Sequence, residues 1–166
     1  MMKRMGWVWA GTFILAMAYL AVLWNCLPER IASHFDFNWR PNGYATKESF
    51  LTVFMTISVA VNLLFLVMGF ITTRLPKELV NIPNKEFWLS TPERTAELDH
   101  RLGIIPCSIG AFVNLVLCMT QQMVYQANVT DPLFRVPAMI LFPGFLIGGL
   151  LLLVFILWLG FAPPKE

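Results

Sequence analysis

The chain has 166 residues, of which 57% are apolar or aromatic and 13% are charged, and its mean hydropathy is +0.65. Soluble domains carry about 25% charged residues, so this composition excludes an ordinary water-soluble domain and indicates that lipid surrounds much of the chain. The net charge of +2 is spread over scattered loop residues, which excludes the basic patch of a nucleic-acid-binding protein. We expect a single domain, a lipid bilayer around it and no nucleic-acid partner.

Four long uncharged stretches predict helices that cross a membrane: residues 6–25, 50–73, 102–125 and 136–162. A helix needs about 20 residues to cross the ~30 Å hydrocarbon core, and each stretch is long enough. Lipid offers no partner to a free backbone N–H or C=O, so a spanning segment must be a helix. The predicted fold class is therefore all-α, an integral membrane four-helix bundle that forms one four-span transmembrane domain over residues 1–166.

The distribution of Lys and Arg predicts which way the bundle faces. The two termini and the middle loop share one side of the membrane, and the first and third loops lie on the other, which has four cations. The side of the termini has eight: Lys3, Arg4, Arg74, Lys77, Lys85, Arg94, Arg101 and Lys165. The positive-inside rule then favours N-in and C-in. Tryptophan prefers the headgroup level, and we expect an inner group and an outer group of indoles: Trp7, Trp9, Trp88 and Trp158 inside, and Trp24 and Trp39 outside.

The outer loop, residues 26–49, is expected to be a short structured cap. Apolar and polar residues alternate from Ile31 to Phe37, which predicts an extended segment. Pro41-Asn42-Gly43 predicts a tight turn, and Thr46 is placed to cap the second span.

His34 and Asp36 raise the question of a metal site in this loop. Zinc needs three or four ligands, and a histidine bonded to a neighbouring group is the more common role, so we predict no metal and no cofactor. The cysteines are odd in number and lack a C-x-x-C spacing, which favours free thiols: Cys26, Cys107 and Cys118.

The inner loop, residues 74–101, is predicted to be amphipathic. Thr91-Pro92-Glu93-Arg94 has an N-cap, a proline at the first position and an acid in the first turn, so a helix should start there and continue into the third span. Glu97 and Arg101 should form an i,i+4 pair. Phe87 and Trp88 are expected to anchor the loop at the membrane interface. The mixed charges are either a solvated face or a surface for a partner.

Small and polar residues recur at helical spacing along the third span and should face the bundle: Gly103, Cys107, Gly110, Asn114, Cys118, Gln121 and Tyr125. Asn62 of the second span and Asn114 both come out near the membrane midplane, where two amides can pair. No ionisable residue accompanies them, so structural pairing is favoured over a substrate path. In the fourth span Pro143 predicts a kink, and Gly144 and Gly148 offer a close-packing face for the bundle or for a second copy.

Both loops resemble a bacterial membrane family of unassigned function. In the outer loop the resemblance rests on Leu27-Pro28, Ile31, His34-Phe35, Pro41-Asn42-Gly43 and Lys47, and in the inner loop on residues 81–88 and Pro92-Glu93-Arg94. The chain departs from the family pattern at Ala32, Trp39 and Asn42. The family is best known as the N-terminal domain of immunity proteins for the sporulation-delaying toxin. The resemblance implies a small protein of the bacterial cytoplasmic membrane linked to toxin immunity and signalling.

We therefore predict a non-enzymatic membrane protein that recognises a peptide or protein partner. The alternatives are a small accessory or structural subunit of a larger membrane protein complex and a transporter component, and a second copy of the chain is a further candidate partner. The spans contain no ionisable residue, and the chain has no metalloprotease, hydrolase or P-loop motif. The candidate residues for partner binding or structure in the outer loop are Pro28, Ile31, His34, Phe35, Asn38, Pro41, Gly43 and Lys47. Those in the inner loop are Asn81, Pro83, Asn84, Trp88, Pro92, Glu93 and Arg94.

Overall fold

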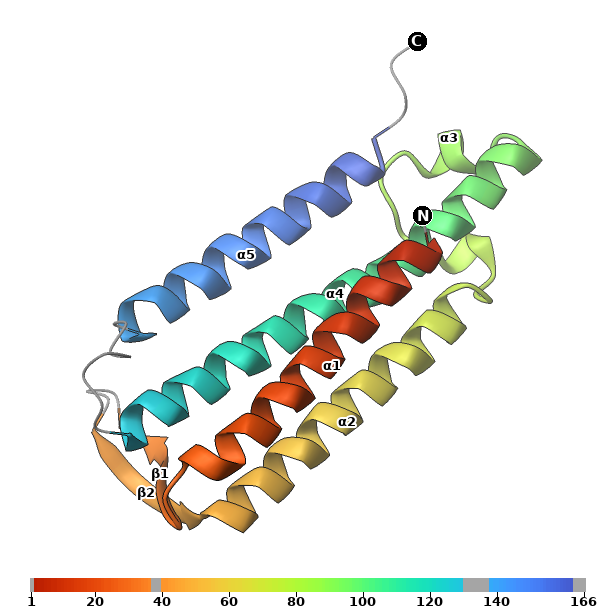
Figure 1. The fold of residues 1–166 in the computed structure, drawn as a ribbon. Coiled ribbons are helices and arrows are strands. Elements are labelled where there is room, and N and C mark those ends of the chain that lie inside the picture. Colours follow the sequence, from red (N-terminus) through yellow and green to blue (C-terminus); the bar gives the residue numbers. More distant parts are fainter. Residues whose placement is uncertain (1, 37–39, 130–137, 163–166) are drawn as a thin grey trace.

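The computed structural model describes residues 2–36, 40–129 and 138–162 of the chain. Four long helices run side by side (Figure 1): α1 (Met2–Cys26), α2 (Lys47–Thr72), α4 (Pro92–Asn128) and α5 (Ala138–Gly160). All four are long and apolar enough to cross a membrane, which confirms the predicted fold class and makes the chain a multi-pass membrane protein. The strands lie at one end of the bundle, here called the hairpin end. The start of α1, the end of α5 and the short helix α3 (Lys85–Leu89) lie at the other, here called the terminal end.

Helix α4 is the central element. It contacts α1 most extensively, then α2, and it also contacts α5, α3 and the first strand. Its 37 residues give a length of about 55 Å, well beyond the ~30 Å hydrocarbon core. The helix therefore includes the charged turns from Glu93 to Arg101 as well as the predicted span 102–125. The predicted continuation of the inner-loop helix into the third span is confirmed.

Helix α5 packs against α4 through aromatic and glycine contacts. The rings of Phe112 and Phe145 stack with their centroids 5.8 Å apart. A Cβ atom at Gly149 would lie 2.5 Å from Phe112, so only glycine allows this approach. By contrast, no described atom lies within 4 Å of a Cβ added at Gly144 or Gly148. The predicted close-packing face is therefore not used against the described part of this chain.

Three helices are joined by one buried amide pair, as predicted. Asn62 Nδ2 donates to Asn114 Oδ1 over 2.8 Å, and Asn114 Nδ2 donates back to Asn62 Oδ1 over 3.1 Å. From α1, the Trp9 indole N–H donates to Asn62 Oδ1 over 2.7 Å, and the Thr12 hydroxyl accepts from Asn114. A Cβ at Gly110 would lie 2.7 Å from the Trp9 nitrogen, so glycine makes room for the indole. The polar edge of Trp9 therefore points into the bundle.

At the terminal end the inner loop folds into a cap. It contains the short 3-10 helix η1 (Lys77–Leu79) and α3, followed by the N-cap of α4, where Thr91 Oγ1 accepts from the Arg94 N–H. Salt bridges join Lys77 to Asp99 and, as predicted, Arg101 to Glu97. A hydrophobic cluster joins the cap to α4 and to the end of α5. It consists of Val80, Trp88, Leu98, Leu102 and Phe161.

Trp88 corrects a sequence expectation. It is 2% exposed, so it is a core residue of the cap and not an interfacial anchor. Its indole N–H donates to the Phe161 carbonyl over 3.2 Å, and Asn84 Nδ2 donates to the same oxygen over 3.3 Å. The Arg101 guanidinium donates to the Gly160 carbonyl and lies over the Trp88 ring. These three side chains satisfy carbonyl groups that the end of α5 leaves without helical partners.

Candidate functional site at the hairpin end

The outer loop forms an antiparallel hairpin of β1 (Arg30–Phe35) and β2 (Pro41–Thr46), so the predicted extended segment is confirmed as far as Phe35. The register shifts on either side of the His34–Gly43 pair, which leaves Ser33 and Asn42 as extra residues. The predicted turn at Pro41-Asn42-Gly43 is wrong, because these residues form the irregular start of β2. The chain reverses instead between Asp36 and Arg40, whose backbones bond over 2.9 Å. The Asp36 carboxylate also accepts from the Arg40 N–H.

Ile31 anchors the hairpin to the bundle. Its side chain is fully buried and packs with Leu23, Leu27 and Val124. Alternation along β1 places this apolar side chain inward while its neighbour Arg30 faces out. The hairpin therefore closes the end of the interface between α1 and α4.

Asn128, the last residue of α4, provides a second anchor. Its Oδ1 accepts from the Ala32 N–H over 2.7 Å, and its Nδ2 donates to the Ala32 carbonyl over 3.0 Å. One side-chain amide thus occupies both backbone groups of β1 on the edge away from β2. Sequence reasoning missed this contact, because the two residues are 96 positions apart and an asparagine at a helix end looks like an ordinary cap.

Lys47 provides a third anchor where β2 passes into α2. Its ammonium bonds to Glu29 Oε1 over 2.9 Å and lies 5.1 Å above the centre of the Trp24 ring. The Lys47 backbone N–H also donates to the Glu29 carbonyl. Thr46 caps α2 as predicted, with its hydroxyl accepting from the Ser49 N–H. The start of α2 is thereby tied to the end of α1.

Beyond these anchors the hairpin presents a set of exposed side chains, here called the hairpin face: Arg30, His34, Arg40, Pro41, Asn42 and Tyr44. The Arg30 guanidinium lies 4.9 Å from the centre of the Tyr44 ring. His34 lies over Gly43, where an added Cβ would approach its side chain to 2.9 Å, and its Nδ1 is 3.1 Å from the Ser33 hydroxyl. The backbone at Gly43 does not have a positive φ, so the glycine serves this close approach.

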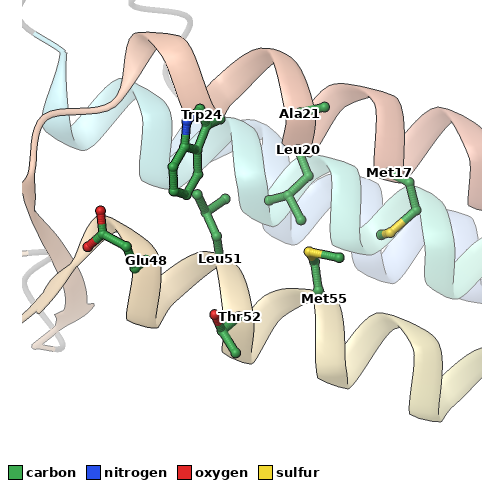
Figure 2. A pocket seen from close by; sticks show the side chains of 8 residues that line it. All are labelled: Met17, Leu20, Ala21, Trp24, Glu48, Leu51, Thr52 and Met55. Carbon is green, nitrogen blue, oxygen red and sulfur yellow. The ribbon is translucent and has the colours of Figure 1, made fainter.

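A groove between α1 and α2 opens next to the hairpin (Figure 2). Its volume is about 570 Å³. The α1 wall consists of Met17, Leu20, Ala21 and Trp24, and the α2 wall consists of Glu48, Leu51, Thr52 and Met55. Both sets have the spacing i, i+3, i+4, i+7, so each is one face of its helix over two turns. Sequence reasoning missed the groove, because both stripes, apart from Glu48 at the mouth, consist of residues like those on the other lipid-facing surfaces.

The structure brings only part of the predicted site residues together. Pro28 is exposed just after α1, Phe35 is half-buried at the end of β1, and Asn38 lies outside the described residues. The inner-loop candidates are at the opposite end of the bundle: Asn81, Pro83, Asn84, Trp88, Pro92, Glu93 and Arg94. The two sets therefore cannot form a single site. Among the described residues, no group of three or more His, Cys, Asp or Glu side chains is arranged to hold a metal ion.

Comparison with known proteins gives one match. Residues 11–58 match a family described as a domain of unknown function (DUF1648). The matched stretch contains most of α1, the hairpin and the first part of α2, and thus every residue that lines the groove. No curated protein and no solved structure matches the chain.

Proposed function

We propose that this multi-pass membrane protein is a non-enzymatic recognition protein that binds a peptide or protein through its hairpin face. The observation that carries the proposal is the way the hairpin is held. Ile31, Asn128 and Lys47 fix it to three helices, while its outward side chains remain exposed. A surface held in place before binding loses little conformational entropy when a partner docks.

The proposal includes a location. The excess of Lys and Arg on the side of the termini supports a bundle with both ends in the cytoplasm and the hairpin outside. The loop resemblance supports the cytoplasmic membrane of a bacterium and a role like that of toxin-immunity proteins. In this setting the partner is a membrane-active peptide that reaches the cell from outside.

The charge of the hairpin face narrows the kind of partner. Arg30 and Arg40 are exposed on it, so acidic groups on the partner would be favoured both in approach and in the complex. A catalytic or transport role has less support. The amides in the middle of the bundle hydrogen-bond to one another, which fits a structural role better than a substrate path.

The test is photo-cross-linking in living cells challenged with membrane-active peptides. A benzoylphenylalanine at Tyr44 should cross-link to a peptide that the cells resist, whereas the same probe at Val154, on the exposed face of α5, should not. Replacing the acidic groups of that peptide by amides should reduce the cross-link. Equal labelling at both positions, or no protection by the protein against any peptide tested, would refute the proposal.

An accessory subunit of a larger membrane complex is the second candidate. It is favoured by the unused face at Gly144 and Gly148, which leaves room for the backbone of another helix. Purification in a mild detergent separates the two candidates. A stoichiometric membrane subunit that is lost in Gly148→Leu and kept in Tyr44→Ala would favour the accessory role over the recognition role.

A further inference from the structure

The groove between α1 and α2 has walls suited to hydrocarbon. Apart from Glu48 and Thr52, every lining residue is apolar. Leu20 and Leu51 are almost fully buried at its floor, where Phe54 and Leu117 pack against them. The groove is open to its surroundings along both walls, since Trp24 is 42% exposed and Met55 is 51% exposed. A depression of this kind that faces lipid is filled by whatever apolar group the bilayer presents.

The dimensions of the groove favour a single flexible chain. Trp24 follows Met17 by seven positions, and Met55 follows Glu48 by the same number, which gives a length of about 10 Å. Two turns are a short contact for a docking helix, whose own diameter is about 10 Å. The two methionines are unbranched and adjust to an irregular occupant. An acyl chain lying along the groove therefore fits better than a helix lying across it.

The mouth of the groove carries charges of both signs. Glu48 is in the first turn of α2, is exposed, and makes no ion pair with any residue in the described ranges. The adjacent Lys47 holds its ammonium above Trp24 on the other wall, where the charge is already paired with Glu29. A phospholipid with an amine headgroup supplies an ammonium for the Glu48 carboxylate. A purely anionic headgroup would face repulsion from Glu48.

We infer that this groove binds one acyl chain of a phospholipid whose amine headgroup pairs with Glu48. The site goes beyond the proposed function, which rests on the hairpin face. The groove lies next to the hairpin, so a bound lipid supports the start of α2 beside the Lys47 anchor. Bilayer lipid is present at high local concentration at all times, which gives it the advantage over a peptide that arrives from outside.

Native mass spectrometry of the full chain tests this inference. The protein is purified from bilayers of equal parts phosphatidylethanolamine and phosphatidylglycerol, and the lipid that survives stepwise delipidation is counted. We expect one retained lipid per chain, with phosphatidylethanolamine favoured about two- to fivefold, the range of a single exposed ion pair. Glu48→Gln should abolish this preference, whereas Glu86→Gln at the terminal end should keep it.

A second pair of variants tests the apolar part of the site. Ala21→Trp places a large side chain in the groove and should eject the retained lipid. Ala18→Trp, on an exposed face of α1 outside the groove, is the matched control and should retain it. A diazirine in the acyl chain should cross-link to the stretches 17–24 and 48–55. Both tryptophan variants should keep the same far-ultraviolet helical signal.

Several outcomes would overturn the inference. These are the retention of no lipid, equal loss of lipid in Ala21→Trp and Ala18→Trp, and an unchanged headgroup preference in Glu48→Gln. A peptide in place of the lipid, cross-linked to the same two stretches, would also overturn it. None of these results bears on the hairpin face, whose own test uses Tyr44.

Discussion

Asn62 and Asn114 form a closed set of hydrogen bonds in the middle of the bundle. Each amide donates to the other, and the remaining N–H groups go to the Ser58 carbonyl and the Thr12 hydroxyl. An amide left without its partner in a buried site costs about 1–3 kcal/mol. Both side chains are at most 9% exposed, so water from the bilayer surface cannot replace the lost partner.

Asn62→Ala should therefore lower the free energy of unfolding by about 1–3 kcal/mol, measured by denaturation in mixed micelles. Asn114→Ala should do the same, and the double variant should lose less than the sum, because each single change already breaks the shared bonds. Leu63→Ala, next to Asn62 on the lipid-facing side, is the control and should change little. Fully additive losses would show that the two amides are not coupled.

Gly110 is needed for the position of Trp9. Gly110→Ala would place a methyl group 2.7 Å from the indole nitrogen, so Trp9 must move and lose its bond to Asn62. We expect a loss of stability of about 1–3 kcal/mol, the usual range for overpacking a buried site. Gly144→Ala, which has open space around it, should be neutral. Equal effects of the two changes would contradict the contact.

At the scale of elements, the hairpin depends on a contact from the far end of α4. Asn128→Ala removes both bonds to Ala32 and frees that edge of β1. Hydrogen exchange at β1 should then become faster, by about tenfold if the pair contributes about 1.4 kcal/mol. Asn25→Ala, at the exposed end of α1, serves as the control. Unchanged protection of Ile31 and Ala32 would mean that burial of Ile31 alone holds the strand.

The end of α5 depends on the cap in a similar way. Arg101→Gln removes a donor from the Gly160 carbonyl and a cation from the Trp88 ring. We expect faster proteolysis or hydrogen exchange at the last turn of α5, while α1 and α2 keep their protection. Arg4→Gln, near the start of α1, is the matched charge control. Loosening of all helices together would indicate that the cap supports the whole bundle.

Sequence patterns predict the helices well, but they predict only some of the contacts between the elements. The four spans, the Thr46 and Thr91 caps and the asparagine pair follow from composition, local spacing and depth in the membrane. The reversal at Asp36–Arg40 was missed, because Pro41-Asn42-Gly43 carries the stronger turn signal. Glycine there serves the approach of His34, and no local rule distinguishes a glycine used for space from one used for a turn.

At the scale of the whole molecule, the distribution of Lys and Arg predicts which side of the membrane the hairpin faces. Cys26 is exposed at the hairpin end, so a membrane-impermeant maleimide added to intact cells should label it if the hairpin faces out. Glu86→Cys in a Cys26→Ser background should be labelled only after the cells are opened. The reverse pattern would invert the bundle and remove the basis for an external partner.

The candidate site was harder to predict than the fold, because it combines residues from α1, α2 and α4 that no spacing connects. Trp88 was expected at the interface and lies in a core, since a short loop folds back over the bundle and covers it. The groove lies where α2 has few contacts with α1, since α2 packs mainly against α4. This arrangement depends on how the helices pack together, and the sequence of each helix taken alone does not show it.

The length of α4 has a mechanical consequence. It is a rod of about 55 Å, with the hairpin attached at Asn128 and the terminal cap at its other tip. Pro106 lies inside α4 and faces Gly69. Proline has no backbone N–H, so one backbone hydrogen bond of the helix is missing at this point. A bend of about 5° at this point shifts the tip that carries Asn128, about 33 Å away, by roughly 3 Å. A movement of the hairpin, which is attached at that tip, is therefore linked to bending of α4 at Pro106.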